Sequence, residues 1–131
     1  MENLNKYLPA FSGKKVLVLG DLMLDEHIWS RVSRISPEAP VPIADVVKIT
    51  HVPGGCGNVA AGIAALGGQP YLVSLIGADS SGEKLLRALE NKNVPTNYLV
   101  RDANRPTILK SRIIAGSQQV VRVDREDRTG V

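Results

Sequence analysis

The sequence predicts an α/β fold, and three observations lead to this expectation. Residues 16–19 and 71–76 are continuous apolar runs, which are typical of parallel strands covered on both faces. Three glycines within 54–57 stand directly before a run whose apolar residues recur at helical spacing. A second helical pattern begins at Ser80, after the second apolar run. Strand and helix therefore alternate along the chain, as they do in right-handed crossover units.

The first elements bring two aspartates to the end of a buried strand. Residues 3–10 are expected to form a short helix, and the strand 16–19 ends just before Asp21, where α/β folds place their ligand crevices. Residues 22–32 are interpreted as a strand that leaves the core. An extended chain would put Asp21 and Asp25 on one face, roughly 13 Å apart. At that separation the two carboxylates cannot act as acid and base on one bond, but each could bind a different hydroxyl of one ligand. For Asp21 the alternative is a turn residue at the end of the strand.

A proline-rich segment and another strand lead to the glycines. Residues 33–42 hold three prolines and are expected to form an extended connector. Residues 43–52 are interpreted as a strand that runs into the glycine-rich segment. The helix after it carries mainly alanine and glycine at 60–65, so it is suited to close packing against a sheet.

The glycine-rich segment is the main candidate binding feature. Gly54, Gly55 and Gly57 would allow positive φ and close approach of a ligand to the free N–H groups of a helix N-terminus. Such a place can hold an anion or a hydroxyl, and Asn58 adds a side chain that both donates and accepts, which suits a polyol. The segment matches neither a P-loop nor the dinucleotide-binding fingerprint. The alternative is a strand-to-helix turn in which the glycines serve geometry alone.

The second helix has a clear start and stop. Ser80 and Glu83 form a capping-box pattern, and Glu83 with Arg87 has the spacing of an ion pair on one helix face. The helix ends at 93–95, Asn-Val-Pro. Its apolar stripe consists of Leu85, Leu86 and Leu89.

The remaining residues are expected to be strands. Residues 98–101 form a third short strand, and 107–115 with 119–124 form a hairpin around Gly116. Only two amphipathic helices are available to cover strands that look buried on both faces. The sequence therefore predicts part of a larger α/β unit.

Composition narrows the class of protein. The chain has 131 residues, a net charge of +3 and one cysteine, Cys56, with no secretion signal and no apolar run of membrane-spanning length. We expect one domain, a cytoplasmic location and no membrane partner. The basic excess lies in 101–131, where few aromatics are present, so we expect no nucleic-acid partner.

His27 and His51 lack partners at metal-ligand spacing, so no metal site is expected. Cys56 is either a reactive thiol at a helix N-terminus or a small residue in an alanine slot.

These residues resemble a known signature. The glycines, small residues and asparagine of 54–60, with Gly67 and Gly77 downstream, are similar to the first signature of the ribokinase-like (PfkB) carbohydrate kinases, with Cys56 in place of the usual Ala, Gly or Pro. Within the family, the chain looks most like the heptose 7-phosphate kinases, the kinase half of the bifunctional ADP-heptose synthases. The segments that carry this likeness are 20–25, 33–42, 53–60, 107–112 and 118–124.

The resemblance implies a particular architecture. Residues 1–131 would be an incomplete ribokinase-like kinase domain, the N-terminal portion of a three-layer α/β/α sandwich. Segments 22–50 and 107–124 would form a small β-sheet lid that closes the site and pairs two subunits into a homodimer. Trp29 would then be a lid or dimer contact, with an ordinary core tryptophan as the alternative.

The resemblance also implies a reaction, the ATP-dependent and Mg²⁺-assisted phosphorylation of the anomeric hydroxyl of heptose 7-phosphate, a step toward ADP-heptose and the lipopolysaccharide core. The sugar hydroxyls would be held by Asp21, Gly54, Gly55 and Asn58, with Asp25 as a further candidate. The 7-phosphate would be held by Arg34, Lys110 and Arg112. For Lys110 and Arg112, which share one face of an extended strand, a solvated surface is the alternative.

One part of the family pattern is missing. The D-x-x-G-A-G-D motif, which carries the catalytic aspartate and the anion hole in this family, is absent from the sequence, as are most ATP contacts. We therefore expect no catalytic residue in this chain, ATP and Mg²⁺ bound mainly elsewhere, and no kinase activity from these residues alone. Two alternatives stay open: another PfkB sugar or nucleoside kinase, and a non-catalytic module for sugar-phosphate binding or dimerisation.

Overall fold

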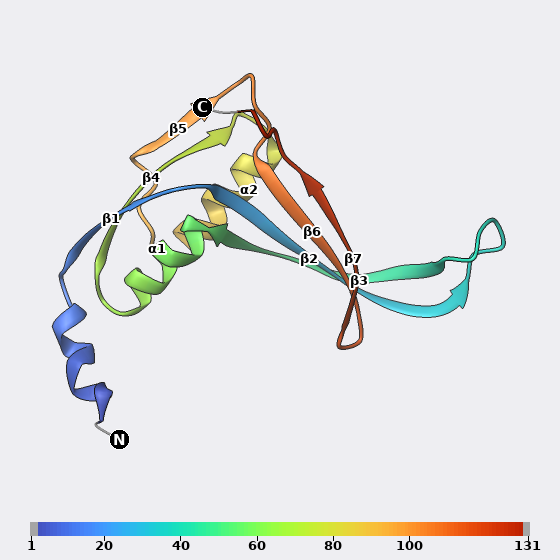
Figure 1. Cartoon of the computed structure of the whole chain (residues 1–131), viewed down its shortest axis with the longest axis horizontal. Helices are drawn as coiled ribbons and strands as arrows, with labels where there is room; N and C mark the ends of the chain where they lie inside the picture. The colour runs from blue at the N-terminus through green and yellow to red at the C-terminus, as the bar shows by residue number, and fades with distance from the viewer. Residues whose placement is uncertain (1–2, 130–131) are drawn as a thin grey trace.

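The computed structural model describes residues 3–129 and contains two sheets and two α-helices, with a 3₁₀ helix at the start (Figure 1). The elements are η1 Leu4–Phe11, β1 Lys15–Leu19, β2 Leu22–Ile35, β3 Pro42–Gly55, α1 Cys56–Ala65, β4 Gln69–Gly77, α2 Ser80–Glu90, β5 Leu99–Asp102, β6 Ile108–Ala115 and β7 Gln118–Arg125. No helix among the described residues is both long and apolar enough to cross a membrane.

The first sheet confirms the predicted parallel strands. Its order is β1-β4-β5, and β4 runs parallel to both neighbours, with Val18 opposite Leu72. Side chains from one face of this sheet meet α1 and α2 in a single apolar core, where Leu72 is fully buried. The other buried members of the core are Val18, Leu22, Leu24, Ala60, Ile76, Leu85, Leu89 and Val94.

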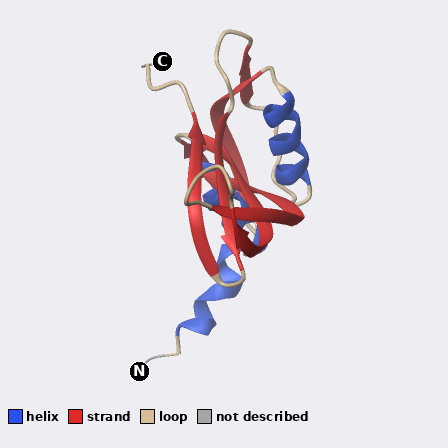
Figure 2. Cartoon of the chain, turned by 90° about the vertical axis from the view of Figure 1, so that its right-hand side faces the viewer, coloured by secondary structure: helices blue, strands red, loops and turns tan. Residues whose placement is uncertain are grey.

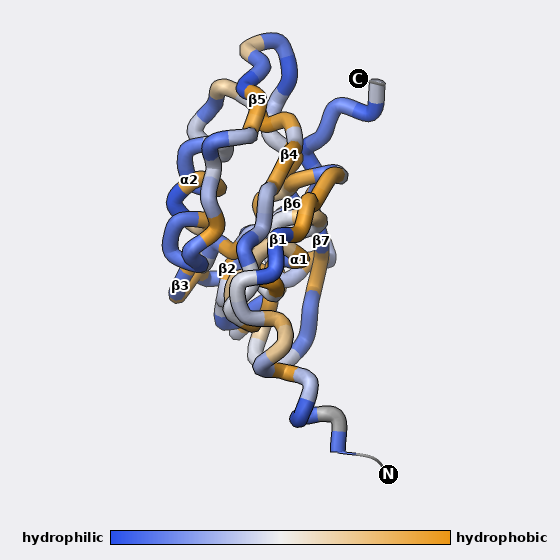
Figure 3. Tube along the Cα trace, turned by 90° about the vertical axis from the view of Figure 1, so that its left-hand side faces the viewer, coloured by the Kyte–Doolittle hydropathy of each residue, from blue (hydrophilic) through white to orange (hydrophobic). Residues whose placement is uncertain are grey.

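The opposite face of the first sheet is uncovered, so the expectation that its strands are buried on both faces is wrong for the described residues. Leu17 and Leu19 of β1 are 68% and 75% exposed, and Val100 of β5 is 57% exposed. Figure 3 shows the apolar segments of β4 and β5 from this side. Both α-helices pack on the other face, so none is left to cover this one. The sequence indicated this shortage of covering helices.

The second sheet unites the two segments that were expected to form a lid. Its order is β3-β2-β6-β7, in which β2 pairs antiparallel with β3 and parallel with β6. The hairpin predicted for β6 and β7 is confirmed, with Gly116 at φ 60 in its turn. Figure 2 shows α2 to one side of the strands.

The predicted proline-rich connector is shorter than expected. Strand β2 continues to Ile35, which pairs with Pro42, so only residues 36–41 form the loop of a long hairpin. This hairpin projects away from the rest of the molecule (Figure 1). Pro42 is tolerated because it is the first residue of an edge strand, where a missing N–H costs little.

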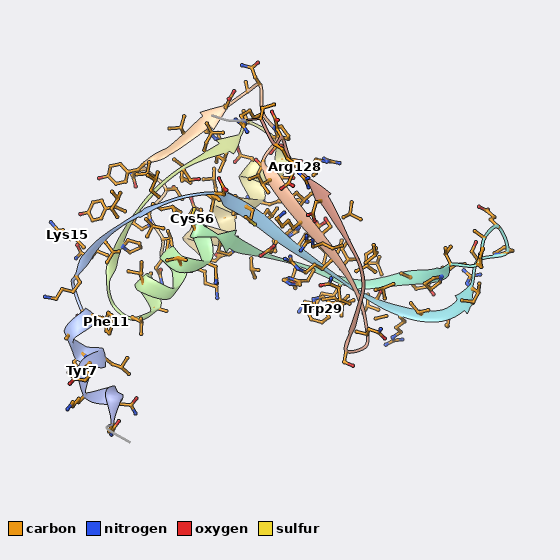
Figure 4. The ribbon with its side chains drawn as sticks, viewed as in Figure 1. Tyr7, Phe11, Lys15, Trp29, Cys56 and Arg128 are labelled. Atoms are coloured by element: carbon orange, nitrogen blue, oxygen red, sulfur yellow. The ribbon has the colours of Figure 1, made fainter. Side chains whose placement is uncertain are left out.

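The two faces of the second sheet differ near the core, although the core-side face also carries the polar Glu26 and Ser111. Leu22 and Leu24 point into the core, whereas Asp25 and Trp29 lie on the polar face. Trp29 is 39% exposed, stacks with His27 and donates its indole N–H to the Thr50 hydroxyl at 3.1 Å. Figure 4 places it near the base of the projecting β2–β3 hairpin. It is therefore not a core tryptophan.

The start of α2 differs from the predicted capping box. The N-cap is Asp79, one residue earlier than expected, and its carboxylate accepts from the Gly82 N–H at 2.8 Å. Glu83 forms its ion pair with Arg101 on β5 and not with Arg87. A partner on a neighbouring strand competes with one on the same helix, and spacing along the sequence cannot show this.

Candidate functional site

The candidate site lies where β1 and β3 end and α1 begins. The Cys56 N–H donates to the Asp21 carbonyl at 3.0 Å, which ties the start of α1 to the end of β1. Strand β3 continues to Gly55 and α1 starts at the next residue, so the expected glycine turn is a single residue with φ 57 and ψ −131. Figure 4 labels Cys56 at this junction.

The three glycines serve different purposes. Gly55 alone among them has positive φ, and a Cβ there would overlap the Asp21 carbonyl oxygen. At Gly54 a Cβ would overlap the carboxylate of Asp25, and at Gly57 it would lie 2.5 Å from the Leu22 side chain. Conformation explains one glycine and close packing explains the other two, which corrects the expectation that all three allow positive φ.

The polar groups predicted to hold hydroxyls surround this junction and are accessible. Asp21 and Asn58 are exposed, and within residues 3–129 neither side chain has a hydrogen-bond partner. The N-cap Gly55 supplies no side-chain cap, and of the first-turn N–H groups of α1 that of Cys56 is taken by the Asp21 carbonyl. A carboxylate and a carboxamide together can accept from and donate to several hydroxyls.

Asp25 lies next to Gly54 and is already paired. The Arg112 guanidinium on β6 donates to its carboxylate at 2.6 Å, and the side chains of Asp25 and Arg112 are 20% and 22% exposed. Arg112 also donates to the Lys110 carbonyl at 3.4 Å. Three neighbouring strands thus contribute to one contact chain from Gly54 through Asp25 to Arg112.

Lys110 shares the polar face with Arg112, as the sequence pattern predicted, and it too is paired. Its ammonium lies 3.2 Å from both Asp124 and Glu126. Desolvation opposes ionisation of Asp124, but hydrogen bonds from Lys110 and Arg122 outweigh it and lower the pKa of Asp124. The two cations therefore stand in ion pairs, not as a bare solvated surface.

Arg34 is not brought to the other candidates. It lies near the outer end of β2, where it pairs with Ile43 and is exposed. Nine residues of extended strand separate it from Asp25, a span of roughly 30 Å. Within this chain Arg34 and Lys110 cannot contact the same phosphate.

A cavity of about 490 Å³ opens beside Asp21, where the uncovered face of the first sheet meets the start of β6. Its wall is mainly apolar, and Asp21 and Ser74 stand among its few polar side chains. The lining residues are Leu19, Gly20, Asp21, Leu22, Val73, Ser74, Leu75, Val100, Arg105, Pro106, Ile108 and Asp127. A ligand held by Asp21 would therefore have room beside it.

Cys56 is not an activated thiol. Burial raises its pKa, hydrogen bonding with Ser74 opposes the rise, and the Asp21 charge adds to it. The thiol donates to the Gly20 carbonyl at 3.2 Å. The structure thus favours the interpretation of Cys56 as a small packing residue over a reactive nucleophile.

This leads to a prediction about thiol reactivity. At pH 7.5 we expect Cys56 to react with a disulfide reagent about 10-fold more slowly than free cysteine, because less thiolate is present and the sulfur is half-buried. Absorbance of the released thiolate measures the rate, with the urea-unfolded chain as the control. A native rate equal to the unfolded rate would contradict this assignment.

Comparison with known proteins agrees with this geometry. Residues 14–129, nearly the whole chain, match the pfkB family of carbohydrate kinases. The chain belongs to the pfkB family of carbohydrate kinases.

Two curated relatives of this pfkB chain carry the name bifunctional protein HldE. That of Caulobacter sp. strain K31 is 49% identical over 127 residues, which cover 97% of this chain and 26% of the relative. That of Caulobacter vibrioides is 49% identical over 130 residues, covering 98% and 27%. The chain thus spans about a quarter of the length of these relatives.

Solved structures show the same fold. The chain is similar to a putative ribokinase from Agrobacterium tumefaciens, with a TM-score of 0.72 and 20% identity over 88% of this chain and 37% of that one. It is also similar to an uncharacterized sugar kinase from Pyrococcus horikoshii in complex with ATP, with a TM-score of 0.58 and 28% identity over 86% and 34%. The predicted class, a partial ribokinase-like α/β domain, is confirmed.

Sequence reasoning missed one polar cluster in this pfkB segment. Glu26 accepts from the Ser111 hydroxyl at 2.7 Å and contacts the His51 ring at 2.9 Å. Desolvation opposes ionisation of Glu26, but these two hydrogen bonds lower its pKa. The three residues lie on three adjacent strands, and only the strand register brings them together.

Proposed function

We propose that this chain is the sugar-binding part of an ATP-dependent kinase that phosphorylates the anomeric hydroxyl of heptose 7-phosphate on the way to ADP-heptose. The observation that carries the proposal is the junction of β1, β3 and α1, where Asp21 and Asn58 are both exposed and the N-cap of α1 supplies no side-chain acceptor. Membership in the pfkB family and two relatives named HldE support it.

Each group at the junction has a role in this proposal. The Asp21 carboxylate accepts from sugar hydroxyls, and Asn58 both accepts and donates. Gly54 and Gly55 would contact the sugar through their backbone, which their lack of a Cβ brings close to Asp25 and Asp21. Asp25 stands behind Gly54 as a further acceptor, held by Arg112. The polar face around Lys110 receives the 7-phosphate.

The phosphate donor belongs to the same proposal. ATP with Mg²⁺ would supply the phosphoryl group, and one similar structure contains ATP. Within residues 3–129, no three His, Cys, Asp or Glu side chains are grouped to hold a metal ion. We expect the groups that hold ATP and Mg²⁺ to be mainly other than those of this chain, and the chain by itself to have no kinase activity.

The second sheet would act as the lid and the subunit contact of a cytoplasmic homodimer. Its outer part exposes apolar side chains that a partner would bury: Val46 is 58% exposed, Ile49 is 49% and Val121 is 45%. These side chains come from β3 and β7, at the two edges of the sheet. Exposed apolar groups on a strand-rich projection are typical of an interaction surface.

The test is kinetic and uses the full-length kinase that contains these residues. We expect Asp21→Ala and Asn58→Ala each to lower kcat/KM for heptose 7-phosphate by about 10- to 100-fold, because each removes hydrogen bonds worth about 1–3 kcal/mol in a desolvated site. Coupled measurement of ADP release gives the rates. Asn97→Ala, which changes an exposed asparagine just before β5, is the matched control.

A substrate panel separates the remaining kinase functions. Fructose, ribose and nucleosides are offered beside heptose 7-phosphate at equal concentration. A preference for one of these would replace the proposed substrate within the same family. Unchanged kcat/KM in both variants would remove Asp21 and Asn58 from the site.

A further inference from the structure

A compact charged cluster on the polar face of β6 and β7 carries a further inference. Lys110 lies between Asp124 and Glu126, and the side chains of these three residues are only 16–20% exposed. Arg112 with Asp25 completes the cluster on the neighbouring strands. The cluster thus concentrates charge on the face of the sheet that also carries Asp25, next to Gly54.

The two contacts of Lys110 with Asp124 and Glu126 are long for charge-assisted hydrogen bonds. Both are 3.2 Å long, whereas a charge-assisted N–H to carboxylate hydrogen bond is commonly about 2.7–2.9 Å. Each carboxylate also has a second cation. Arg122 donates to both Asp124 oxygens at 2.9 and 3.1 Å, and Arg128 donates to Glu126 at 2.8 Å. Neither carboxylate would be left without a cation if Lys110 turned to another anion.

Arg112 is held differently. Its contact with Asp25 is 2.6 Å long, and within residues 3–129 the Asp25 carboxylate accepts from no other side chain. If Arg112 turned to an incoming anion, the largely buried Asp25 carboxylate would lose its cation, which is costly. Arg112 is therefore fixed to Asp25, whereas Lys110 is free to change partners.

We propose that Lys110 is the anchor for the phosphate group of the substrate, and that Asp124 and Glu126 occupy its ammonium until a phosphate monoester dianion displaces them. This proposal rests on the proposed function and deepens it. In the exchange the ammonium leaves two carboxylates, which stay on Arg122 and Arg128, and binds one dianion. Arg112 does not bind the phosphate but positions Asp25 beside Gly54.

The exchange predicts opposite effects of neighbouring substitutions. Inorganic phosphate is titrated into the 131-residue chain at pH 7.5 and low salt, and amide and side-chain shifts are followed by NMR. We expect Glu126→Gln to tighten binding about 3-fold and Asp124→Asn with Glu126→Gln about 10-fold, since internal competitors are removed. Lys110→Ala should weaken binding at least about 10-fold. Arg112→Ala should stay within about 2-fold of the parent chain.

The controls make each result decisive. Lys92→Ala removes an exposed lysine elsewhere and measures the effect of net charge alone, and dispersed amide spectra confirm that every variant is folded. The inference is overturned if Lys110→Ala binds phosphate as tightly as the parent chain, if Glu126→Gln does not tighten binding, or if Arg112→Ala weakens it as much as Lys110→Ala.

Failure here is distinguishable from failure of the proposed function. Inorganic phosphate carries no sugar, so the titration reports on Lys110 and its carboxylates alone. Loss of activity in the Asp21→Ala and Asn58→Ala variants of the full-length kinase, with no phosphate binding by this chain, would overturn the exchange and keep the sugar site. The reverse pair of results would overturn the sugar site and keep an anion site at Lys110.

Discussion

Gly55→Ala is expected to destabilise the chain by about 3 kcal/mol, as the sum of backbone strain and a lost hydrogen bond. Gly55 has φ 57 and ψ −131, a conformation that L-residues rarely adopt, and an added Cβ would overlap the Asp21 carbonyl oxygen. That carbonyl accepts the Cys56 N–H at the start of α1. The substitution must therefore shift the junction of β1, β3 and α1, and urea unfolding followed by circular dichroism measures the loss.

Gly62→Ala is the matched control, because it adds the same methyl group inside α1, the helix that begins after Gly55, without these obstacles. Nothing lies within 4 Å of a Cβ at this position, which is exposed on α1. We expect it to stabilise the chain by about 0.5–1 kcal/mol, the helix propensity difference between Ala and Gly. Similar effects of Gly55→Ala and Gly62→Ala would contradict the role assigned to the junction.

Asp79→Ala is expected to destabilise the chain by about 2–3 kcal/mol, more than loss of a helix cap alone. Its carboxylate accepts from Gly82 at the start of α2 and from both the N–H and the hydroxyl of Thr107, at 2.8–3.0 Å. Thr107 is 1% exposed, and its hydroxyl also accepts from the Gly77 N–H at 3.0 Å. One side chain thus fastens α2 to the chain that enters β6, and thermal unfolding measures its loss.

The pH dependence of this contribution has a definite sign. Desolvation opposes ionisation of Asp79, but the hydrogen bonds outweigh it and lower its pKa below the ordinary value of 3.8. The carboxylate therefore stabilises the fold above that value, and this contribution is lost as pH falls through the folded pKa. The difference in unfolding free energy between the parent chain and Asp79→Asn should be constant from pH 5 to 7 and shrink below about pH 4.

Ser80→Ala is the control for the helix cap. The capping-box pattern names Ser80 as the cap, whereas the structure gives that position to Asp79. We expect Ser80→Ala to change the unfolding free energy by no more than about 0.5 kcal/mol, because Ser80 is an exposed first-turn residue. A larger loss at Ser80 than at Asp79 would restore the interpretation drawn from the sequence.

Local patterns predicted much of the fold because their physical cause is local. The apolar runs 16–19 and 71–76 are too short for typical helices, and both lie in strands that pair in parallel. The glycines before Asn58 open a helix, and their spacing led directly to the pfkB family. The surplus of strands over helices indicated an uncovered sheet face, which the structure shows at Leu17 and Leu19.

Partners across strands could not be predicted in this way. Lys110 and Arg112 share a face, as alternation requires, but their carboxylate partners lie on β7 and β2. The register between strands decides those partners, and a change of register by one residue would place every side chain on the other face. The same limit explains why the Glu26 cluster was missed and why Glu83 was assigned to the wrong arginine.

The sequence by itself determined the α/β class, the order of strands and helices, and the family signature at 54–58, because spacing and conformational freedom are properties of short segments. Only the tertiary structure decided that Asp25 belongs to Arg112, that Lys110 is shared by two carboxylates, and that Arg34 lies apart. These contacts join strands that are up to 87 residues apart in sequence, and electrostatic pairing depends on distance in space and not along the chain.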